Sequence, residues 1–324
     1  MTQEQRQIIL EIDAIAKTKT LETFEDRWLQ YVDENQGPNR KSLSDFSLPD
    51  DRNKDVIVIV GPGPSILQYQ ERIRELSDVA TICVLPTALE WSLSQGLYPD
   101  FVVIQDSGYD GISIPGDCPF IGPTTLQPGL VQAKDMYLFT LLLGGGIFNS
   151  WDEYSLRVDS DLDGGITSMG CVTNMAIEVV TLLRGSGQLR ASKIVLIGQD
   201  FGGWRGLARV PRFGATEPPK IGDKGVTDEW LEWNGFQTDP RMIWYKYKLL
   251  LLWARTNAPL WSTSHGMLYE IPFVFFERLL TGRFPSGYPG HKDIVRRFEQ
   301  YAALMADTFP REEIDAEEVV DYST

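Results

Sequence analysis

The chain has 324 residues, of which 43% are hydrophobic and 11% aromatic, so it can bury one large core or two smaller ones, which excludes disorder throughout. Its formal net charge of −15 at pH 7 argues against nucleic acid or an anionic membrane as a partner, because both would repel an acidic surface. The most apolar stretch, Tyr137 to Phe148, contains three glycines and falls short of the roughly 18 residues of a membrane-spanning helix. No membrane span is therefore expected.

The cysteines and the first residues indicate a reducing compartment. Cys83, Cys118 and Cys171 are odd in number, far apart and in no C-x-x-C pair, which favours neither a disulfide frame nor a zinc site. The polar start of the chain has no apolar signal region behind it. We expect a cytoplasmic protein and, with only two histidines in the chain, no histidine-based zinc site.

Residues 1–48 are predicted to be a helical N-terminal segment. Their apolar side chains follow helical spacing in two stripes, Ile8, Ile12 and Ile15, then Leu21, Phe24, Trp28 and Tyr31. Turn residues from Pro49 to Asn53 place a domain boundary near residue 50. We expect the main domain at 50–282, followed at 283–324 by a C-terminal helix and an acidic tail.

The first buried strand, Val56 to Val60, runs directly into a glycine turn. Its five consecutive β-branched residues suit a parallel strand that is buried on both faces. In Gly61-Pro-Gly-Pro-Ser65 the two glycines allow a sharp turn and a close approach to a ligand, and Ser65 with Gln68 forms the pattern of a helix capping box. The amides of such a helix start could hold an anion, although the same residues also suit a tight strand-to-helix turn that binds nothing.

Beyond this turn, strand and helix patterns alternate. Strands are predicted at 80–85, 101–105, 137–143, 193–197 and 259–261, and helices at 87–95, 167–183, 239–256 and 293–305. Thr87 and Glu90 form a second capping pattern, and Asp239 followed by Pro240 is a strong helix start. Such alternation predicts an α/β fold, a Rossmann-like open and mostly parallel sheet with helices on both faces.

Polar residues follow several of these strands. They are Gly61 to Ser65, Gln105 to Ser107, Gly198 to Asp200 with Gln199 between, and Thr263 to His265. An open parallel sheet binds its ligand beyond the carboxyl ends of its strands, so we expect these residues around one site. Asp106 and Asp200 could bond a sugar hydroxyl, hold magnesium through water or act as a base, or else each caps the next element.

Two other segments offer chemistry. Gly164, Gly165, Thr167 and Ser168 precede a long helix and make a second candidate anion site. His265, in a polar turn, is a candidate general acid or base, or a structural histidine. The acidic run from Asp159 to Asp163 lacks the glutamate that a calcium loop needs at its twelfth position, so we expect a turn there, with a D-x-D metal site as the alternative.

A set of motifs in fixed order resembles a known family. The motifs are Val-Gly-Pro-Gly-Pro-Ser65, Gly96-Leu-Tyr-Pro-Asp-Phe-Val-Val-Ile-Gln-Asp106, Gly164-Gly-Ile-Thr-Ser168, Ile-Val-Leu-Ile-Gly-Gln-Asp200 and Asn234-Gly-Phe-Gln-Thr238. Over roughly residues 35 to 282 the chain resembles the motility-associated factors, whose core is the 6-hydroxymethylpterin diphosphokinase MptE-like domain. Members of that family look like glycosyltransferases that place nonulosonic, sialic-like acids on flagellin, with a fold similar to bacterial sialyltransferases.

The resemblance implies roles for individual residues. Gly61, Gly63, Pro64 and Ser65 would line the nucleotide phosphates, Asp106 and Gly164 to Ser168 would face the same crevice, and Asp200 would lie at its floor. A CMP-activated sugar would be the donor, and Asp106, Asp200 and His265 are the candidates for the base.

Two departures from the family pattern leave alternatives open. The chain lacks the long flanking domains, and Phe201 to Gly206 replaces the usual histidine-bearing stretch. One alternative is diphosphoryl transfer from ATP to a pterin-like alcohol, with Mg²⁺ held by Asp106 and Asp200. The other is a non-catalytic nucleotide-binding or scaffold protein.

Overall fold

The computed structural model describes residues 41–105, 118–127, 135–139, 141–142, 166–167, 171–211, 217–223, 230–233, 236–264 and 266–308, together with 27, 28, 30, 31, 34 and 35. Of the predicted N-terminal helices, only residues 27, 28, 30, 31 and 34 fall within the described helical positions. No helix in this described part is both long enough and apolar enough to cross a membrane.

The centre of the fold is an eight-stranded sheet, and every pairing in it is parallel. In spatial order its strands are β1 (Lys41–Ser42), β6 (Met136–Phe139), β5 (Phe120–Pro123), β4 (Phe101–Val103), β3 (Thr81–Val84), β2 (Val56–Val60), β9 (Lys193–Ile197) and β12 (Leu260–Ser262). From β2 the chain adds strands outward on one side as far as β6, and then returns to place β9 and β12 on the other side. The order of strands therefore reverses between β2 and β9, which confirms the predicted open, parallel α/β sheet.

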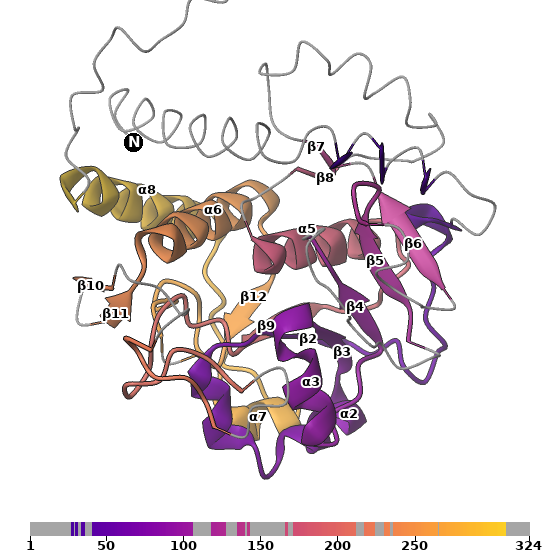
Figure 1. The fold of residues 1–324 in the computed structure, drawn as a ribbon, viewed down its shortest axis with the longest axis horizontal. Coiled ribbons are helices and arrows are strands. Elements are labelled where there is room, and N and C mark those ends of the chain that lie inside the picture. The colour runs from indigo at the N-terminus through magenta and orange to yellow at the C-terminus, as the bar shows by residue number, and fades with distance from the viewer. Residues whose placement is uncertain are drawn as a thin grey trace, which may run out of the picture.

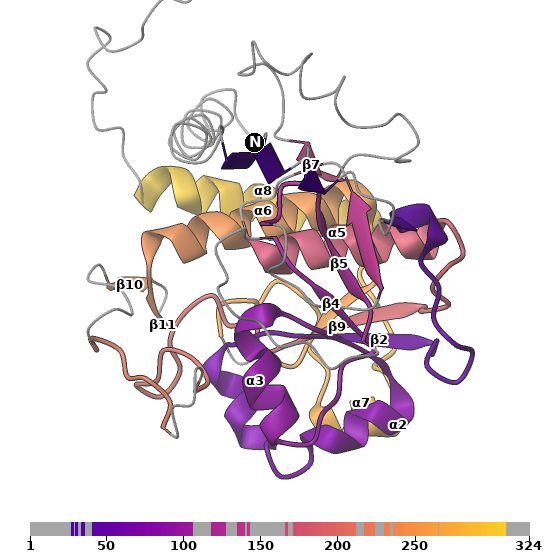
Figure 2. The same ribbon diagram turned by 45° about the vertical axis from the view of Figure 1, so that its right-hand side comes forward.

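Helices cover both faces of this sheet (Figure 1). On one face lie α5 (Val172–Gly185), α6 (Pro240–Thr256) and α8 (His291–Thr308); on the other lie α2 (Leu76–Val79), α3 (Pro86–Ser94) and α7 (Phe276–Leu280). The same three layers are seen after a turn of 45° (Figure 2). Smaller elements are the parallel pair β7 (Leu141–Leu142) and β8 (Ile166–Thr167), the hairpin β10 (Leu231–Trp233) and β11 (Phe236–Thr238), and the 3₁₀ helices η1 (Leu43–Asp45), η2 (Pro64–Tyr69) and η3 (Ile73–Glu75).

The alternation of side chains along β2 builds two cores. Ile57 and Ile59 face the layer of α5, α6 and α8, whereas Val58 and Val60 face the layer of α2, α3 and α7. All four side chains are fully buried. An apolar run without polar interruption is what a strand between two helical layers requires.

Both flanking segments add to this central unit. Lys41 and Ser42, in the predicted N-terminal segment, pair with Tyr137 and Leu138 of β6 at the edge of the sheet. Beyond residue 282, Phe298 on α8 packs into the same core as α5 and α6. The turn before α8 contributes as well, because the hydroxyl of Tyr288 donates to the carbonyl of Ala258 at 2.6 Å.

Two predicted helix-capping patterns are wrong, and one is confirmed. The helix after the glycine turn is the 3₁₀ helix η2, whose N-cap is Gly63, and Ser65 caps nothing. Similarly α3 begins at Pro86 with Leu85 as its N-cap, so the Thr87 capping pattern is not used. Asp239 does cap α6, because its carboxylate accepts a hydrogen bond from the amide of Arg241 at 2.7 Å.

Candidate functional site

The carboxyl ends of β2 and β9 meet where the strand order reverses. Their two extensions stay paired beyond the sheet, because the amide of Gly61 donates to Ile197 at 2.8 Å and that of Gly63 donates to Gly198 at 2.6 Å. In open α/β sheets a ligand binds in the crevice outside such a switch point. The predicted glycine turn and the Gly198-Gln-Asp200 segment therefore form the two walls of one candidate site.

The glycines of these walls face protein atoms. A Cβ at Gly63 would lie 2.6 Å from both the Asp200 carboxylate and the carbonyl of Gly198, and one at Gly61 would overlap the side-chain amide of Gln199. Gly198 has φ +66° and lies against the carbonyl of Gly61. Glycine is needed here because two backbones approach more closely than side chains permit.

Asp200 ties together the ends of three strands. Its carboxylate accepts hydrogen bonds from the amide of Ser65 at 2.7 Å, from the hydroxyl of Ser65 at 2.6 Å and from the hydroxyl of Ser264. Its backbone carbonyl accepts from the amide of Met267 at 2.9 Å. Asp200 is only 1% exposed, and these hydrogen bonds offset part of the cost of burying its carboxyl group.

Gln199 points toward the start of α5. Its Oε1 accepts a hydrogen bond from the hydroxyl of Thr173 at 2.7 Å, in the first turn of that helix. Its Nε2 is buried and has no hydrogen-bond partner within the described part of the chain. A buried donor left unpaired costs free energy, so this amide is suited to an acceptor that comes from a ligand.

The N-terminus of α5 adds further donors. Its N-cap is Cys171, which makes no side-chain capping bond, and the amide of Met175 is bonded to the carbonyl of Cys171. The amides of residues 172–174 precede the first intrahelical bond, and those of Thr173 and Asn174 interact with the Cys171 thiol. Burial raises the pKa of the Cys171 thiol to about 11, so the thiol is neutral and does not repel an anion.

A loop after Asp200 lies against the glycine turn. The amide of Val210 donates to the carbonyl of Pro62 at 2.8 Å. Phe201 and Arg205 both have φ 51°, a left-handed conformation that costs energy for residues other than glycine. The hydroxyl of Thr238 holds Phe201 by donating to its carbonyl at 2.6 Å, and the guanidinium of Arg205 lies 4.3 Å from the ring centroid of Trp204.

The structure brings six of the predicted residues together at this edge: Gly61, Gly63, Pro64, Ser65, Gln199 and Asp200. Thr167 lies in β8, which pairs with β7. Five other candidates, Asp106, Gly164, Gly165, Ser168 and His265, lie outside the described residues. The binding and catalytic roles of all these residues remain predictions.

One polar residue of the site, Thr173, was missed in the sequence. Ser264 lay within the polar segment Thr263 to His265 that was expected at the site, but only His265 was given a role there. Thr173 was not considered because the helix was predicted to begin at Thr167, which would place Thr173 inside the helix. In the structure α5 begins at Val172, so Thr173 lies in its first turn. The signal for Thr173 would have been a hydroxyl in the first turn of a helix after a glycine-rich segment.

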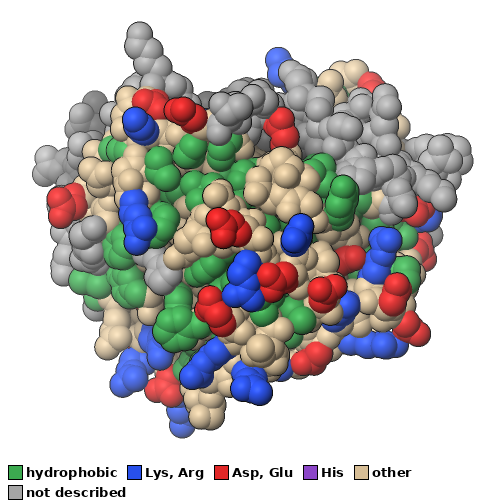
Figure 3. Space-filling view, turned by 90° about the horizontal axis from the view of Figure 1, so that it is seen from below, with side chains coloured by type: hydrophobic (Ala, Val, Ile, Leu, Met, Phe, Trp, Pro, Cys, Tyr) green, Lys and Arg blue, Asp and Glu red, His purple; other side chains and the backbone are tan. Residues whose placement is uncertain are grey.

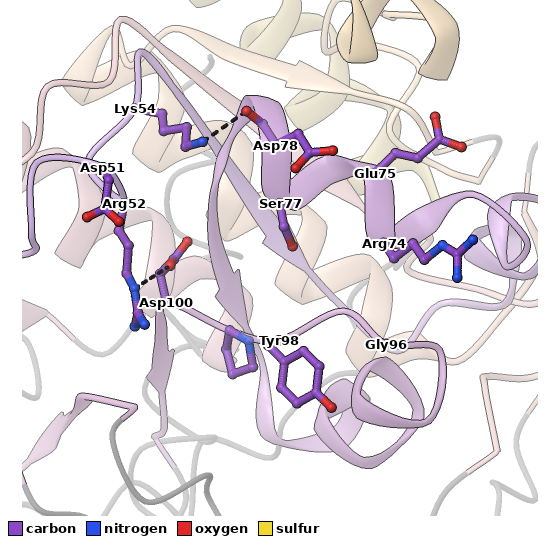
Figure 4. A pocket seen from close by; sticks show the side chains of 11 residues that line it. Asp51, Arg52, Lys54, Arg74, Glu75, Ser77, Asp78, Gly96, Tyr98 and Asp100 are labelled. Atoms are coloured by element: carbon purple, nitrogen blue, oxygen red, sulfur yellow. Dashed lines mark hydrogen bonds and ion pairs between the residues drawn. The ribbon is translucent and has the colours of Figure 1, made fainter.

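A groove of about 680 Å³ lies at the opposite edge of the sheet, at the amino ends of β2, β3 and β4 (Figure 4). Two of its cations have partners: Lys54 donates to the backbone carbonyl of Asp78 at 2.9 Å, and Arg52 lies 3.9 Å from the Asp100 carboxylate. The adjoining helical face likewise mixes both signs of charge (Figure 3). Within the described part of the chain, none of the groove residues has a buried donor without a partner, as Gln199 Nε2 does, so we place the candidate site at the carboxyl ends.

No group of three or more histidine, cysteine, aspartate or glutamate side chains within the described ranges is arranged to hold a metal ion.

Comparison with solved structures finds a likeness to the MAf glycosyltransferase of Magnetospirillum magneticum AMB-1, with a TM-score of 0.54 and 18% identity. The likeness covers 90% of this chain and 45% of the other, so this chain spans less than half of that protein. No match is found among curated proteins.

The comparison with family models finds a match that spans both walls of the site. The model of the 6-hydroxymethylpterin diphosphokinase MptE-like family matches residues 26–205, which include the glycine turn, the start of α5 and Asp200. That range is more than half of the chain. The chain belongs to the 6-hydroxymethylpterin diphosphokinase MptE-like family.

Proposed function

We propose that this chain is a cytoplasmic glycosyltransferase-like enzyme that moves a nonulosonic, sialic-like acid from a CMP-activated donor to a hydroxyl of a protein or glycan, such as flagellin. The family and the fold shared with a glycosyltransferase support this proposal. The observation that carries it is Gln199 Nε2 at the switch point, which is buried next to the start of α5 and has no hydrogen-bond partner among the described residues.

The donor phosphate would bind between the glycine turn and α5. A phosphate there accepts a hydrogen bond from Gln199 Nε2, and the positive end of the α5 dipole stabilises its charge. Gly61, Gly63 and Pro64 form the opposite wall. In this assignment Ser65 acts by holding Asp200, since its amide and its hydroxyl both bond that carboxylate.

The reaction needs a base and a stabilised leaving group. The acceptor oxygen forms a bond to the anomeric carbon of the sugar, the bond from that carbon to the phosphate oxygen breaks, and CMP leaves with the electron pair. The acceptor proton goes to the base. We keep His265 and Asp106 as candidates for the base and assign Asp200 a positioning role, because its carboxylate is buried and already accepts three hydrogen bonds.

The family match also favours a second candidate function, the transfer of a diphosphoryl group from ATP to a pterin-like alcohol. That reaction requires Mg²⁺ to neutralise the phosphates, with Asp106 and Asp200 as its carboxylate partners. Ser65 and Ser264 already occupy both oxygens of Asp200, so this aspartate would hold the ion through water.

Thermal unfolding with CMP, CDP, UDP, ADP and ATP, each with and without Mg²⁺, distinguishes these functions, because a ligand that binds only the folded state stabilises it. We expect CMP to raise the Tm without metal. If only ATP with Mg²⁺ raises the Tm, the diphosphokinase is correct instead. If no nucleotide raises the Tm, the protein is better explained as a non-catalytic scaffold.

The variant Gln199→Met tests whether the buried Nε2 of Gln199 binds the donor phosphate. It keeps the length of the side chain and removes the buried donor, so we expect CMP to bind about tenfold more weakly, the effect of losing a bond to a charged group. The matched control is Gln95→Met on the opposite face, where the side-chain amide bonds its exposed neighbour Ser94. Equal CMP affinity in Gln199→Met and the wild type would rule out this placement of the phosphate.

A further inference from the structure

A buried ion pair lies beside the candidate site. Lys246 on α6 is fully buried, Glu270 is 8% exposed, and the ammonium Nζ lies 2.8 Å from Oε1 of the carboxylate. The ammonium also lies 3.8 Å from the ring centroid of Tyr269 and 4.5 Å from that of Tyr301 on α8. Two ring faces and one carboxylate thus surround a single charge.

Glu270 belongs to the loop 266–271, whose other end packs against Asp200. A Cβ on Gly266 would lie 2.5 Å from the carbonyl oxygen of Asp200, and the amide of Met267 bonds that same oxygen at 2.9 Å. Directly before the loop, Ser264 bonds the Asp200 carboxylate. The loop therefore connects the ion pair to the residue that holds the strand ends together.

Two helices contact the Glu270 end of this loop. Lys246 contributes from α6, and from α8 the guanidinium of Arg297 donates to the backbone carbonyl of Glu270. The hydroxyl of Tyr301 donates to the carbonyl of Ile243 at 3.1 Å, which fixes α8 against α6. The Glu270 end of the loop is thus attached to both helices.

A buried ion pair contributes little net free energy to the stability of a fold. Removing two charges from water costs about as much as their attraction returns, and an apolar pair of similar size would stabilise the core as well or better. A charged pair differs from an apolar pair in direction, because the carboxylate must face the ammonium. That directionality is of use where a loop has to keep one position.

We propose that Lys246 and Glu270 are positioning residues, whose ion pair fixes the loop 266–271 and through it the orientation of Asp200 and the glycine turn. The loop carries this effect through Met267 and Gly266, without contact between the ion pair and the candidate ligand. The consequence for nucleotide binding rests on the proposed function, whereas the effect on the loop does not.

The double variant Lys246→Met/Glu270→Met tests this proposal. It fills the same space and leaves no lone buried charge, so we expect it to fold with a Tm close to that of the wild type. Hydrogen exchange in the ligand-free protein should become about tenfold faster at Met267 and at Ser65, whose amides bond Asp200, and stay unchanged in β3. CMP should bind about tenfold more weakly.

The outcomes separate the proposal from its rival. A purely structural pair predicts that the double variant, once folded, keeps both the exchange rates and the CMP affinity, and that result would overturn the proposal. If exchange accelerates while CMP fails to bind even the wild type, the positioning role stands and the proposed function fails. The control is Arg72→Met/Glu75→Gln, which removes an exposed pair with a 2.9 Å contact and should change neither readout.

A single variant gives a second test if the double variant does not fold. Glu270→Gln keeps the shape of the side chain and removes its charge, so the loop loses its ionic anchor while the core stays filled. We expect faster exchange at Met267 in this variant also. Unchanged exchange in a folded Glu270→Gln variant contradicts the proposal.

Discussion

At the scale of the residue, the glycine turn shows that one motif can serve two purposes. A G-x-G-P-S turn after a strand favours close approach to a ligand, yet here Gly61 and Gly63 first allow the ends of β2 and β9 to touch. Ser65 is likewise engaged by Asp200 and caps no helix. Next to this turn, Gln199 Nε2 is a buried donor without a hydrogen-bond partner among the described residues.

Gly63→Ala tests this account of the turn. The added Cβ would lie 2.6 Å from the Asp200 carboxylate and from the Gly198 carbonyl, so a backbone must shift, and we expect a loss of about 1–3 kcal/mol in the free energy of unfolding. Urea denaturation measures the change. Gly185→Ala is the control, because no atom lies within 4 Å of its added Cβ. Equal stability of the two variants would contradict the tight packing.

At the scale of the element, α6, α8 and the loop 266–271 meet around one buried charge. Burial lowers the pKa of Lys246 to about 8, and the charge of Glu270 opposes this shift. Burial also raises the pKa of Glu270, against the effect of Lys246. The other titratable and charged groups around the pair are Tyr269, Tyr247, Tyr301 and Arg297.

The sign of the resulting pH dependence follows from linkage. Between about pH 8 and the ordinary lysine pKa of 10.5, the unfolded chain holds a proton that folded Lys246 has lost, so the folded state gains stability as the pH rises. We expect the stability of the wild type, relative to Lys246→Met/Glu270→Met, to rise by up to about 1.4 kcal/mol per pH unit in this window. Urea denaturation between pH 7 and 9.5 measures it, and a flat or falling difference would contradict the lowered pKa.

At the scale of the whole molecule, segments from both ends of the described chain complete one α/β unit. Lys41 and Ser42 extend the sheet beside β6, and α8 lies on α6 in the layer that also contains α5 (Figure 2). The candidate site depends on that assembly, because the loop against Asp200 is held by α6 and α8. Under the positioning proposal, α8 supports the candidate site as well as the core.

Phe298→Ala tests whether α8 unfolds together with the sheet. Phe298 is 6% exposed and packs against Tyr247 of α6 with ring centroids 5.3 Å apart, so we expect a loss of about 3–5 kcal/mol. Tryptophan fluorescence and circular dichroism should report the same urea midpoint. The control is Arg296→Ala, which is exposed and should change stability by less than about 0.5 kcal/mol. Two separate transitions would mean that α8 is an independent unit.

Local pattern in the sequence determined much of this protein. The runs Val56 to Val60 and Lys193 to Ile197 predict buried parallel strands, and both were found at those bounds. Asp239 before Pro240 predicts the start of α6, and polar residues after each strand predict the edge that carries the candidate site. These features depend on neighbours within a few positions, so hydrophobic periodicity and helix capping suffice to find them.

Only the tertiary structure decided which distant residues meet. Ser65 faces Asp200 and not its own helix, Gln199 faces Thr173, and Lys246 meets Glu270 from another element. Strand β1 joins β6 at the edge of the sheet, although its two residues carry no strand signal of their own. Such partners are selected by the order of strands and the packing of helices, which fix distances between positions far apart in the chain and leave no local pattern in the sequence.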